Sequence, residues 1–156
     1  MFINKFTRIS SHLFVIALFL IKESRSEDCN LNRSLSIGEY MNIHNPNYPG
    51  WDSGKFKCIY SANTNEDNRL QLKCKLGLPT SQLCDSQTFA VFKNPSSLLN
   101  IPSFFYGNGT FRRKSIKNEI TIVYEGSENS SSGYFRCNIT AVAASTLPEK
   151  SVYRFP

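Results

Sequence analysis

Short segments in which hydrophobic and polar residues alternate are the feature that most constrains how this chain can fold. In the clearest one, residues 70–76 (LQLKCKL), four apolar residues would share one face of a strand, and Gln71, Lys73 and Lys75 the other. Residues 120–124 and 134–139 alternate in the same way, and turn-forming residues separate such segments. Because no stretch carries a helical apolar stripe, the sequence predicts an all-β sandwich.

The first 26 residues predict a secretory signal peptide. Lys5 and Arg8 precede an uninterrupted run of nine apolar residues, 13–21, and the small residues Ser24 and Ser26 precede a cleavage site before residue 27. Nine apolar residues are too few to span a bilayer, which takes about 20. No second apolar run follows. We therefore expect a secreted, extracellular product that begins at residue 27 and has no membrane anchor.

Removal of the signal peptide on secretion would also halve the net charge of the chain. The whole chain carries +6, but residues 1–26 account for +3 of it, so the mature chain is only mildly basic. The sequence lacks a surface on which basic and aromatic residues interleave. A nucleic-acid partner is therefore not expected.

Five cysteines, at positions 29, 58, 74, 84 and 137, are expected to form disulfides in an oxidising compartment. There is no C-x-x-C pair, and His44 is the only histidine after residue 26, so no zinc or iron–sulfur site is expected. Cys74 and Cys137 both fall on apolar strand faces and could meet inside the core. Because five is odd, at least one thiol lacks an intramolecular partner.

A cysteine, a P-N-Y-P turn and a second cysteine together give the chain a family resemblance. Cys29, residues 45–50 (NPNYPG) and Cys58 resemble the opening of a CUB domain, and residues 105–107 (FYG) and 133–135 (GYF) resemble later CUB elements. The resemblance implies a disulfide-stapled antiparallel β-sandwich, a CUB-like jelly roll, over residues 27–140. Residues 141–156 are expected to form an unstructured C-terminal extension.

The resemblance also implies the disulfide pairing. Cys29 would pair with Cys58, and Cys74 with Cys137, as in an arthropod variant that is found in venom proteins and before trypsin-like protease domains. Tyr106 stands where the family usually has the cysteine that would pair with Cys84. Cys84 is therefore expected to be an unpaired thiol, either buried as a small apolar residue or available to link a partner or a dimer.

Neither catalysis nor calcium binding is expected. Residues 52–54 (DSG) include a serine, but His44 is the only available base and lies beside a turn, whereas a catalytic triad needs three converging groups. Many CUB domains bind calcium through a glutamate before the second cysteine, but here residues 54–57 read GKFK. Calcium requires several carboxylate oxygens. We expect a non-catalytic protein without metal or cofactor.

One basic cluster is a candidate partner site. It comprises four side chains that could hold an acidic glycan or an extracellular protein, namely Arg112, Arg113, Lys114 and Lys117. The alternative is a solvated strand end that discourages edge pairing. Four N-glycosylation sequons, at Asn32, Asn108, Asn129 and Asn138, fit a secreted β-rich domain.

These observations favour a secreted, non-catalytic CUB-type interaction module. The module could be free-standing, or it could be the amino-terminal portion of a CUB-containing serine protease. The alternative is a small secreted ligand carrier with an aromatic-lined pocket, built from Phe104, Phe105, Phe111 and Tyr124. Because large aromatic side chains usually fill a core, a structure distinguishes the two.

Overall fold

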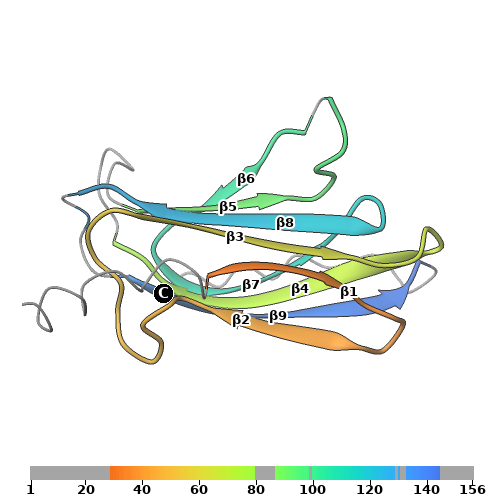
Figure 1. Ribbon diagram of the computed structural model, residues 1–156, viewed down its shortest axis with the longest axis horizontal. Helices are drawn as coiled ribbons and strands as arrows, with labels where there is room; N and C mark the ends of the chain where they lie inside the picture. The colour runs from red at the N-terminus through yellow and green to blue at the C-terminus, as the bar shows by residue number, and fades with distance from the viewer. Residues whose placement is uncertain (1–28, 80–86, 99, 129, 131–132, 145–156) are drawn as a thin grey trace, which may run out of the picture.

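A computed structural model describes residues 29–79, 87–98, 100–128, 130 and 133–144 of the chain. Within these residues the chain forms nine strands (Figure 1). In chain order they are β1 (Asn30–Ser34), β2 (Tyr40–His44), β3 (Phe56–Asn63), β4 (Asn68–Gly77), β5 (Gln87–Phe92), β6 (Ser103–Phe105), β7 (Asn108–Lys114), β8 (Glu119–Gly126) and β9 (Tyr134–Ala143). The predicted signal peptide, Cys84, Asn129 and residues 145–156 lie outside the described residues.

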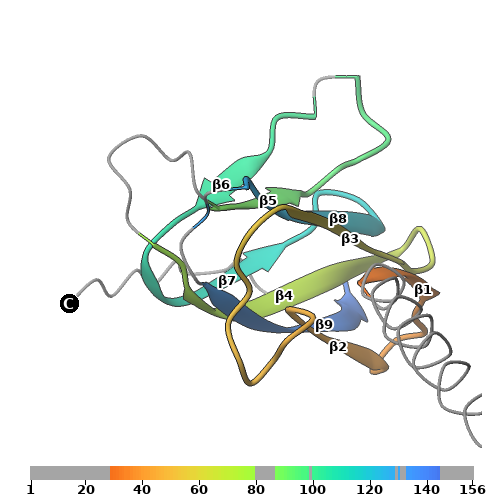
Figure 2. The same ribbon diagram turned by 60° about the vertical axis from the view of Figure 1, so that its left-hand side comes forward.

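The strands form two sheets that face each other as layers (Figures 1 and 2). One sheet has the order β1-β3-β8-β5-β6, and the other has the order β2-β9-β4-β7. The all-β two-layer sandwich is the predicted fold. All strand pairs are antiparallel except β1 and β3, which are parallel. A bridge from Cys29, just before β1, to Cys58 in β3 holds this parallel pair together at the sheet edge.

The alternation predicted from the sequence is confirmed by burial. In β4 the apolar residues Leu70, Leu72 and Leu76 are buried, whereas Lys73 and Lys75 are exposed. Four large aromatic rings lie between the sheets and meet edge to face or at a tilt; they belong to Tyr60, Phe89, Tyr124 and Phe135. Such ring pairs contribute about 0.5–1.5 kcal/mol each beyond their buried area.

The four aromatic residues that suggested a carrier pocket do not surround a common cavity. Phe105 and Phe111 stack with their ring centroids 3.8 Å apart, and Tyr124 packs against Phe89 and Phe135 in the core. Phe104 is 54% exposed on the outside of β6. Among the described residues, the buried rings therefore fill space between the sheets and do not line the common pocket that the carrier hypothesis requires.

Two disulfides cross-link the sandwich. Cys29 is joined to Cys58, and Cys74 to Cys137. Cys74 and Cys137 are direct register partners on β4 and β9, with Cα atoms 4.1 Å apart, and both side chains are buried. These are the two pairs that the CUB resemblance implies.

Polar groups at one end of the core are joined by hydrogen bonds. The Tyr124 hydroxyl donates to Gln87 Oε1 over 3.0 Å, Gln87 Nε2 donates to the Asp52 carbonyl over 2.8 Å, and the Tyr60 hydroxyl donates to the His44 carbonyl over 2.9 Å. Burial, with a smaller contribution from the Asp52 charge, raises the pKa of both tyrosines well above the ordinary value. Both hydroxyls therefore stay protonated and act as donors.

The turn at residues 45–50 is fastened to the sheets by the buried Asn45. Its Nδ2 donates to the Gly50 carbonyl, and its Oδ1 accepts from the Phe135 amide. Asp52 is also buried, and its Oδ1 accepts two bonds from Asn47. Asp52 is thus a buried residue that supports the structure of this turn.

The C-terminal boundary of the domain differs from the expected one. Strand β9 continues past residue 140 to Ala143, and Ala141 is buried with its partner Leu70 on β4. Residues 141–143 therefore belong to the sheet and not to an unstructured extension. The backbone of residues 141–143 pairs with residues 68–70 of β4, so the hydrogen-bonding groups of this segment find partners within the sheet.

Candidate functional site: a basic sheet face

Charge is distributed very unevenly between the two sheets. The strands of the β2-β9-β4-β7 sheet contain no aspartate or glutamate and seven basic residues, which are Arg69, Lys73, Lys75, Arg112, Arg113, Lys114 and Arg136. The strands of the other sheet contain two basic residues, Arg33 and Lys57, and two acidic ones, Glu119 and Glu125. The positive charge of the domain is therefore concentrated on one layer.

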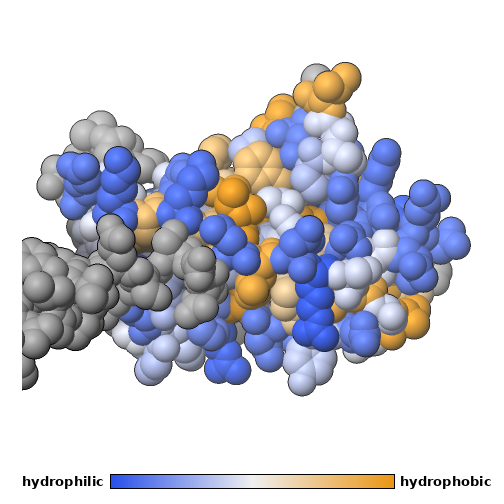
Figure 3. Space-filling view, in the orientation of Figure 1, coloured by the Kyte–Doolittle hydropathy of each residue, from blue (hydrophilic) through white to orange (hydrophobic). Residues whose placement is uncertain are grey.

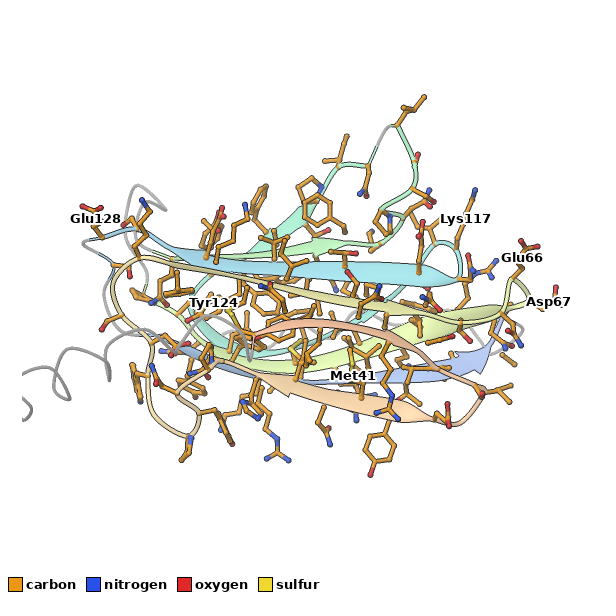
Figure 4. The ribbon with its side chains drawn as sticks, in the orientation of Figure 1. Met41, Glu66, Asp67, Lys117, Tyr124 and Glu128 are labelled. Atoms are coloured by element: carbon orange, nitrogen blue, oxygen red, sulfur yellow. A yellow bond between two sulfur atoms is a disulfide. The ribbon has the colours of Figure 1, made fainter. Side chains whose placement is uncertain are left out.

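Four of these residues point away from the core. Lys73, Lys75, Arg112 and Arg136 are exposed, because each lies on the face of its strand opposite the buried side chains. Figure 4 shows the side chains of this sheet projecting on the side away from the other layer, and Figure 3 shows hydrophilic atoms along the same margin.

The strand register arranges these residues in two rows across the sheet. The first row reads Asn42, Asn138, Lys73 and Arg112, each beside the next on neighbouring strands. The second row reads His44, Arg136, Lys75 and Thr110. Neighbouring strands lie about 4.8 Å apart, and positions two apart along a strand are separated by about 7 Å. We call the four cations with Asn42 and Asn138 the basic face.

A groove of about 690 Å³ runs over the basic face. Its lining includes all six residues of the basic face together with Thr110 and three residues whose side chains point into the core. The groove is therefore floored by the sheet itself and edged by cationic and amide side chains.

The basic face places like charges directly opposite each other. Lys73 is the register partner of Arg112, and Lys75 is the partner of Arg136. Cross-strand pairs of like charge destabilise a sheet. Across the described part of the chain, no carboxylate forms an ion pair with any of these four residues; the ion pair found there joins Lys57 to Glu125 on the other sheet at 3.3 Å. An anionic ligand would supply the missing counter-charge.

The basic cluster predicted from residues 112–117 is divided by the fold. Arg112 belongs to the basic face. Lys114 is two residues further along β7 and so lies on the same side of the strand, but it is half-buried and donates to the Ala144 carbonyl over 3.3 Å. Arg113 points to the other side, with its guanidinium carbon 5.1 Å from the Phe105 ring centroid. Lys117 lies beyond β7, at the end of the sandwich where Glu66 and Asp67 also lie (Figure 4).

Sequence reasoning missed three of the four cations of the basic face. Lys73, Lys75 and Arg136 are far from residues 112–117 in the sequence, and only the order β9-β4-β7 brings them beside Arg112. A signal for them existed, because the alternation in β4 and β9 already placed them on polar faces without any acidic neighbour.

Three of the predicted glycosylation sequons fall on described strands. Asn32 is exposed on β1 of the other sheet, Asn108 is exposed at the start of β7, and Asn138 is half-buried in the first row of the basic face. Asn138 Nδ2 donates to Asn42 Oδ1 over 3.0 Å, and the Thr140 hydroxyl donates to Asn138 Oδ1 over 2.7 Å.

The donor set for calcium is poor. Lys57 stands directly before Cys58 and forms the ion pair with Glu125, so a cation already neutralises that carboxylate. Within the described ranges, no three His, Cys, Asp or Glu side chains come together as metal ligands would. Calcium prefers six to eight oxygens with several carboxylates. The described residues therefore do not fit a calcium site of that kind.

His44 and Asp52, the base and the carboxylate that a catalytic triad would need, both make hydrogen bonds to the turn at residues 45–50. His44 Nδ1 lies 2.9 Å from the Asn45 carbonyl, and the Asp52 carboxylate accepts bonds from Asn47.

In the described part of the chain we find no helix with the length and hydropathy to cross a membrane.

Comparison with known proteins identifies the fold. No protein-family model matches the sequence. Over 107 residues the chain is 28% identical to venom serine protease 34 of Apis mellifera; the match covers 68% of this chain and 24% of the bee protein. The chain thus spans about a quarter of that relative's length.

Solved structures with a similar architecture include CUB domains. The CUB1-EGF-CUB2 domain of human MASP-1/3 matches with a TM-score of 0.58 at 18% identity, over 67% of this chain and 42% of that one. The MASP-1 CUB2 domain bound to Ca²⁺ matches with a TM-score of 0.51 at 14% identity, over 68% of this chain and 96% of that one. The chain has the CUB domain fold, in the form of a two-sheet sandwich with two disulfides.

Proposed function

We propose that the chain is a secreted, non-catalytic CUB-type interaction module that binds a linear sulfated polysaccharide on its basic face. One observation carries this proposal: the register sets Lys73 beside Arg112 and Lys75 beside Arg136, on a sheet whose strands contain no acidic residue. Two disulfides and a CUB fold support an extracellular location, where such polymers occur.

The composition of the basic face favours a polysaccharide over an acidic protein. Protein–protein interfaces are usually centred on buried aromatic or other large side chains. Neither row of the basic face contains an apolar side chain, and the exposed Tyr40 lies one row further along β2. A surface of regularly spaced cations without an apolar anchor suits a polymer whose charges repeat along a line.

The proposal is tested by binding of size-defined heparin oligosaccharides to immobilised, unglycosylated protein. A variant with Lys73, Lys75, Arg112 and Arg136 all changed to glutamine should bind at least about 100-fold more weakly, since each lost contact costs about 1 kcal/mol. Binding of the wild type should weaken as salt is raised, because the charges are exposed.

A control variant that has the same net charge as the basic-face variant distinguishes a localised binding site from a general effect of protein charge. It changes four basic residues outside the basic face to glutamine: Arg33, Lys55, Lys93 and Lys117. This control should bind within about twofold of the wild type. An equal loss in both variants would refute a site on the basic face. Capture of an acidic protein without heparin binding would assign the basic face to a protein partner instead.

The module could act alone or at the amino terminus of a serine protease. The similarity to a venom serine protease of Apis mellifera supports the second arrangement, and this chain spans only 24% of that protein. An open reading frame that continues into an I-V-G-G activation sequence and a histidine-containing catalytic half would establish the protease arrangement; a stop codon after residue 156 would establish the free-standing one.

A further inference from the structure

A glycosylation sequon lies inside the proposed polysaccharide site. Residues 138–140 read N-I-T, and Asn138 occupies the first row of the basic face between Asn42 and Lys73. Resting on the proposed function, we infer that N-glycosylation of Asn138 closes the basic face to its polysaccharide ligand. Occupancy of this one sequon then decides whether the secreted protein binds sulfated polysaccharide.

The position of Asn138 within the sheet makes the overlap unavoidable. Strand β9 is interior, with β2 on one side and β4 on the other, so a sugar attached to Asn138 has sheet on both sides. Directly opposite side chains in a sheet lie about 5 Å apart, which is the separation expected between Asn138 and Lys73. Arg136 is two residues away on the same strand, at about 7 Å.

The side-chain contacts of Asn138 direct its amide along the sheet surface. Asn138 Nδ2, the atom to which a glycan is attached, lies 3.0 Å from Asn42 Oδ1. Both residues line the groove of about 690 Å³. An N-glycan is bulky and branched, so its first sugars would lie in this groove and cover the cations beside it.

The other described sequons stand elsewhere on the domain. Asn32 is on β1 of the opposite sheet, and Asn108 is at the far end of β7, in register with Gly77. A glycan at Asn32 would leave the basic face open, which makes Asn32 the matched control position.

The experiment uses protein secreted from glycosylating animal cells. In an Asn32→Gln, Asn108→Gln and Asn129→Gln background, molecules with and without a glycan at Asn138 are separated on a lectin column, and occupancy is measured by peptide mass spectrometry. Each fraction is titrated with a size-defined heparin oligosaccharide. The fraction without the glycan should bind at least tenfold more tightly than the occupied fraction.

Sequon variants give a second readout that does not depend on the separation. Asn138→Gln and Thr140→Ala both abolish the sequon and should match the unoccupied fraction. Thr140→Ser keeps the Asn138 sequon and should match the occupied fraction. Asn32→Gln, made alone in the wild-type chain, also keeps that sequon and should match the glycosylated wild-type protein. Agreement between Asn138→Gln and Thr140→Ala guards against a fold defect in either variant.

The possible failures are distinguishable. Equal affinity of the occupied and unoccupied fractions overturns the inference while the proposed function survives. A secreted protein in which Asn138 is never occupied also overturns it. If the unoccupied fraction and both sequon-free variants fail to bind heparin, the proposed function itself is wrong.

Discussion

Two neighbouring arginines should have separate roles, because β7 points them in opposite directions. Arg112 is exposed on the basic face beside Lys73. Arg113 is half-buried, with its guanidinium carbon 5.1 Å from the Phe105 ring centroid and 5.9 Å from that of Phe111. We predict that Arg112→Gln weakens polysaccharide binding without lowering stability, and that Arg113→Gln lowers stability without weakening binding.

The magnitudes follow from the two environments. Removal of one exposed cation from a charged ligand costs about 1 kcal/mol, which is about a fivefold loss in affinity. The same change removes the like-charge pair of Arg112 and Lys73, so the free energy of unfolding should be unchanged or slightly higher. Loss of a guanidinium over aromatic rings costs about 1 kcal/mol, which lowers the Tm of a domain of this size by about 4 °C.

The assay combines heparin titration with thermal unfolding for the two variants, prepared side by side on the unglycosylated protein. The outcome that refutes the reasoning is a fivefold loss of affinity in Arg113→Gln with an unchanged Tm. That result would mean that residues 112–117 act as one contiguous patch and that strand alternation does not select the binding residues.

Two further predictions concern the stability of the sandwich. Replacing Cys74 and Cys137 with alanine should lower the free energy of unfolding by about 4 kcal/mol, because the chain-entropy model assigns that value to a disulfide with a sequence separation of 63. Urea unfolding measures this change, and a loss below about 1 kcal/mol would contradict the prediction. The raised pKa values of Tyr60 and Tyr124 mean that the folded state favours the neutral hydroxyls, so stability should be complete below about pH 10 and fall as pH rises further. Tyr124→Phe should flatten this alkaline fall and should cost about 1–2 kcal/mol at neutral pH, because Gln87 Oε1 loses its donor; an unchanged alkaline dependence in urea titrations would count against the buried hydroxyl.

Much of the fold could be predicted from the sequence because it depends on local patterns. The alternation of residues 70–76 fixed which face of β4 is buried, and the same pattern in residues 134–139 placed Cys137 inward. The parallel pairing of β1 with β3 could not be predicted in this way. It depends on Asn30–Ser34, which is exposed throughout and carries no alternating pattern.

The basic face depends on information that local patterns lack. Alternation alone indicates that Lys73, Lys75, Arg112 and Arg136 point outward, but not that they lie on one surface. The strand order β9-β4-β7 and the register that pairs Lys75 with Arg136 join them. Proximity in sequence, which grouped Arg113 with Arg112, is a poor guide in a strand because neighbouring residues point to opposite faces.

The most direct test of the basic face is a lysine acetylation footprint of Asn138→Gln protein, with and without a saturating heparin oligosaccharide. Lys73 and Lys75 line the groove, whereas Lys55 and Lys117 are exposed away from it. We predict that the ligand slows acetylation of Lys73 and Lys75 at least about fivefold, since a bound sulfate neutralises and covers each amine, and leaves Lys55 and Lys117 within twofold. Equal protection of all four lysines, or protection of Lys55 and Lys117 alone, would contradict the account.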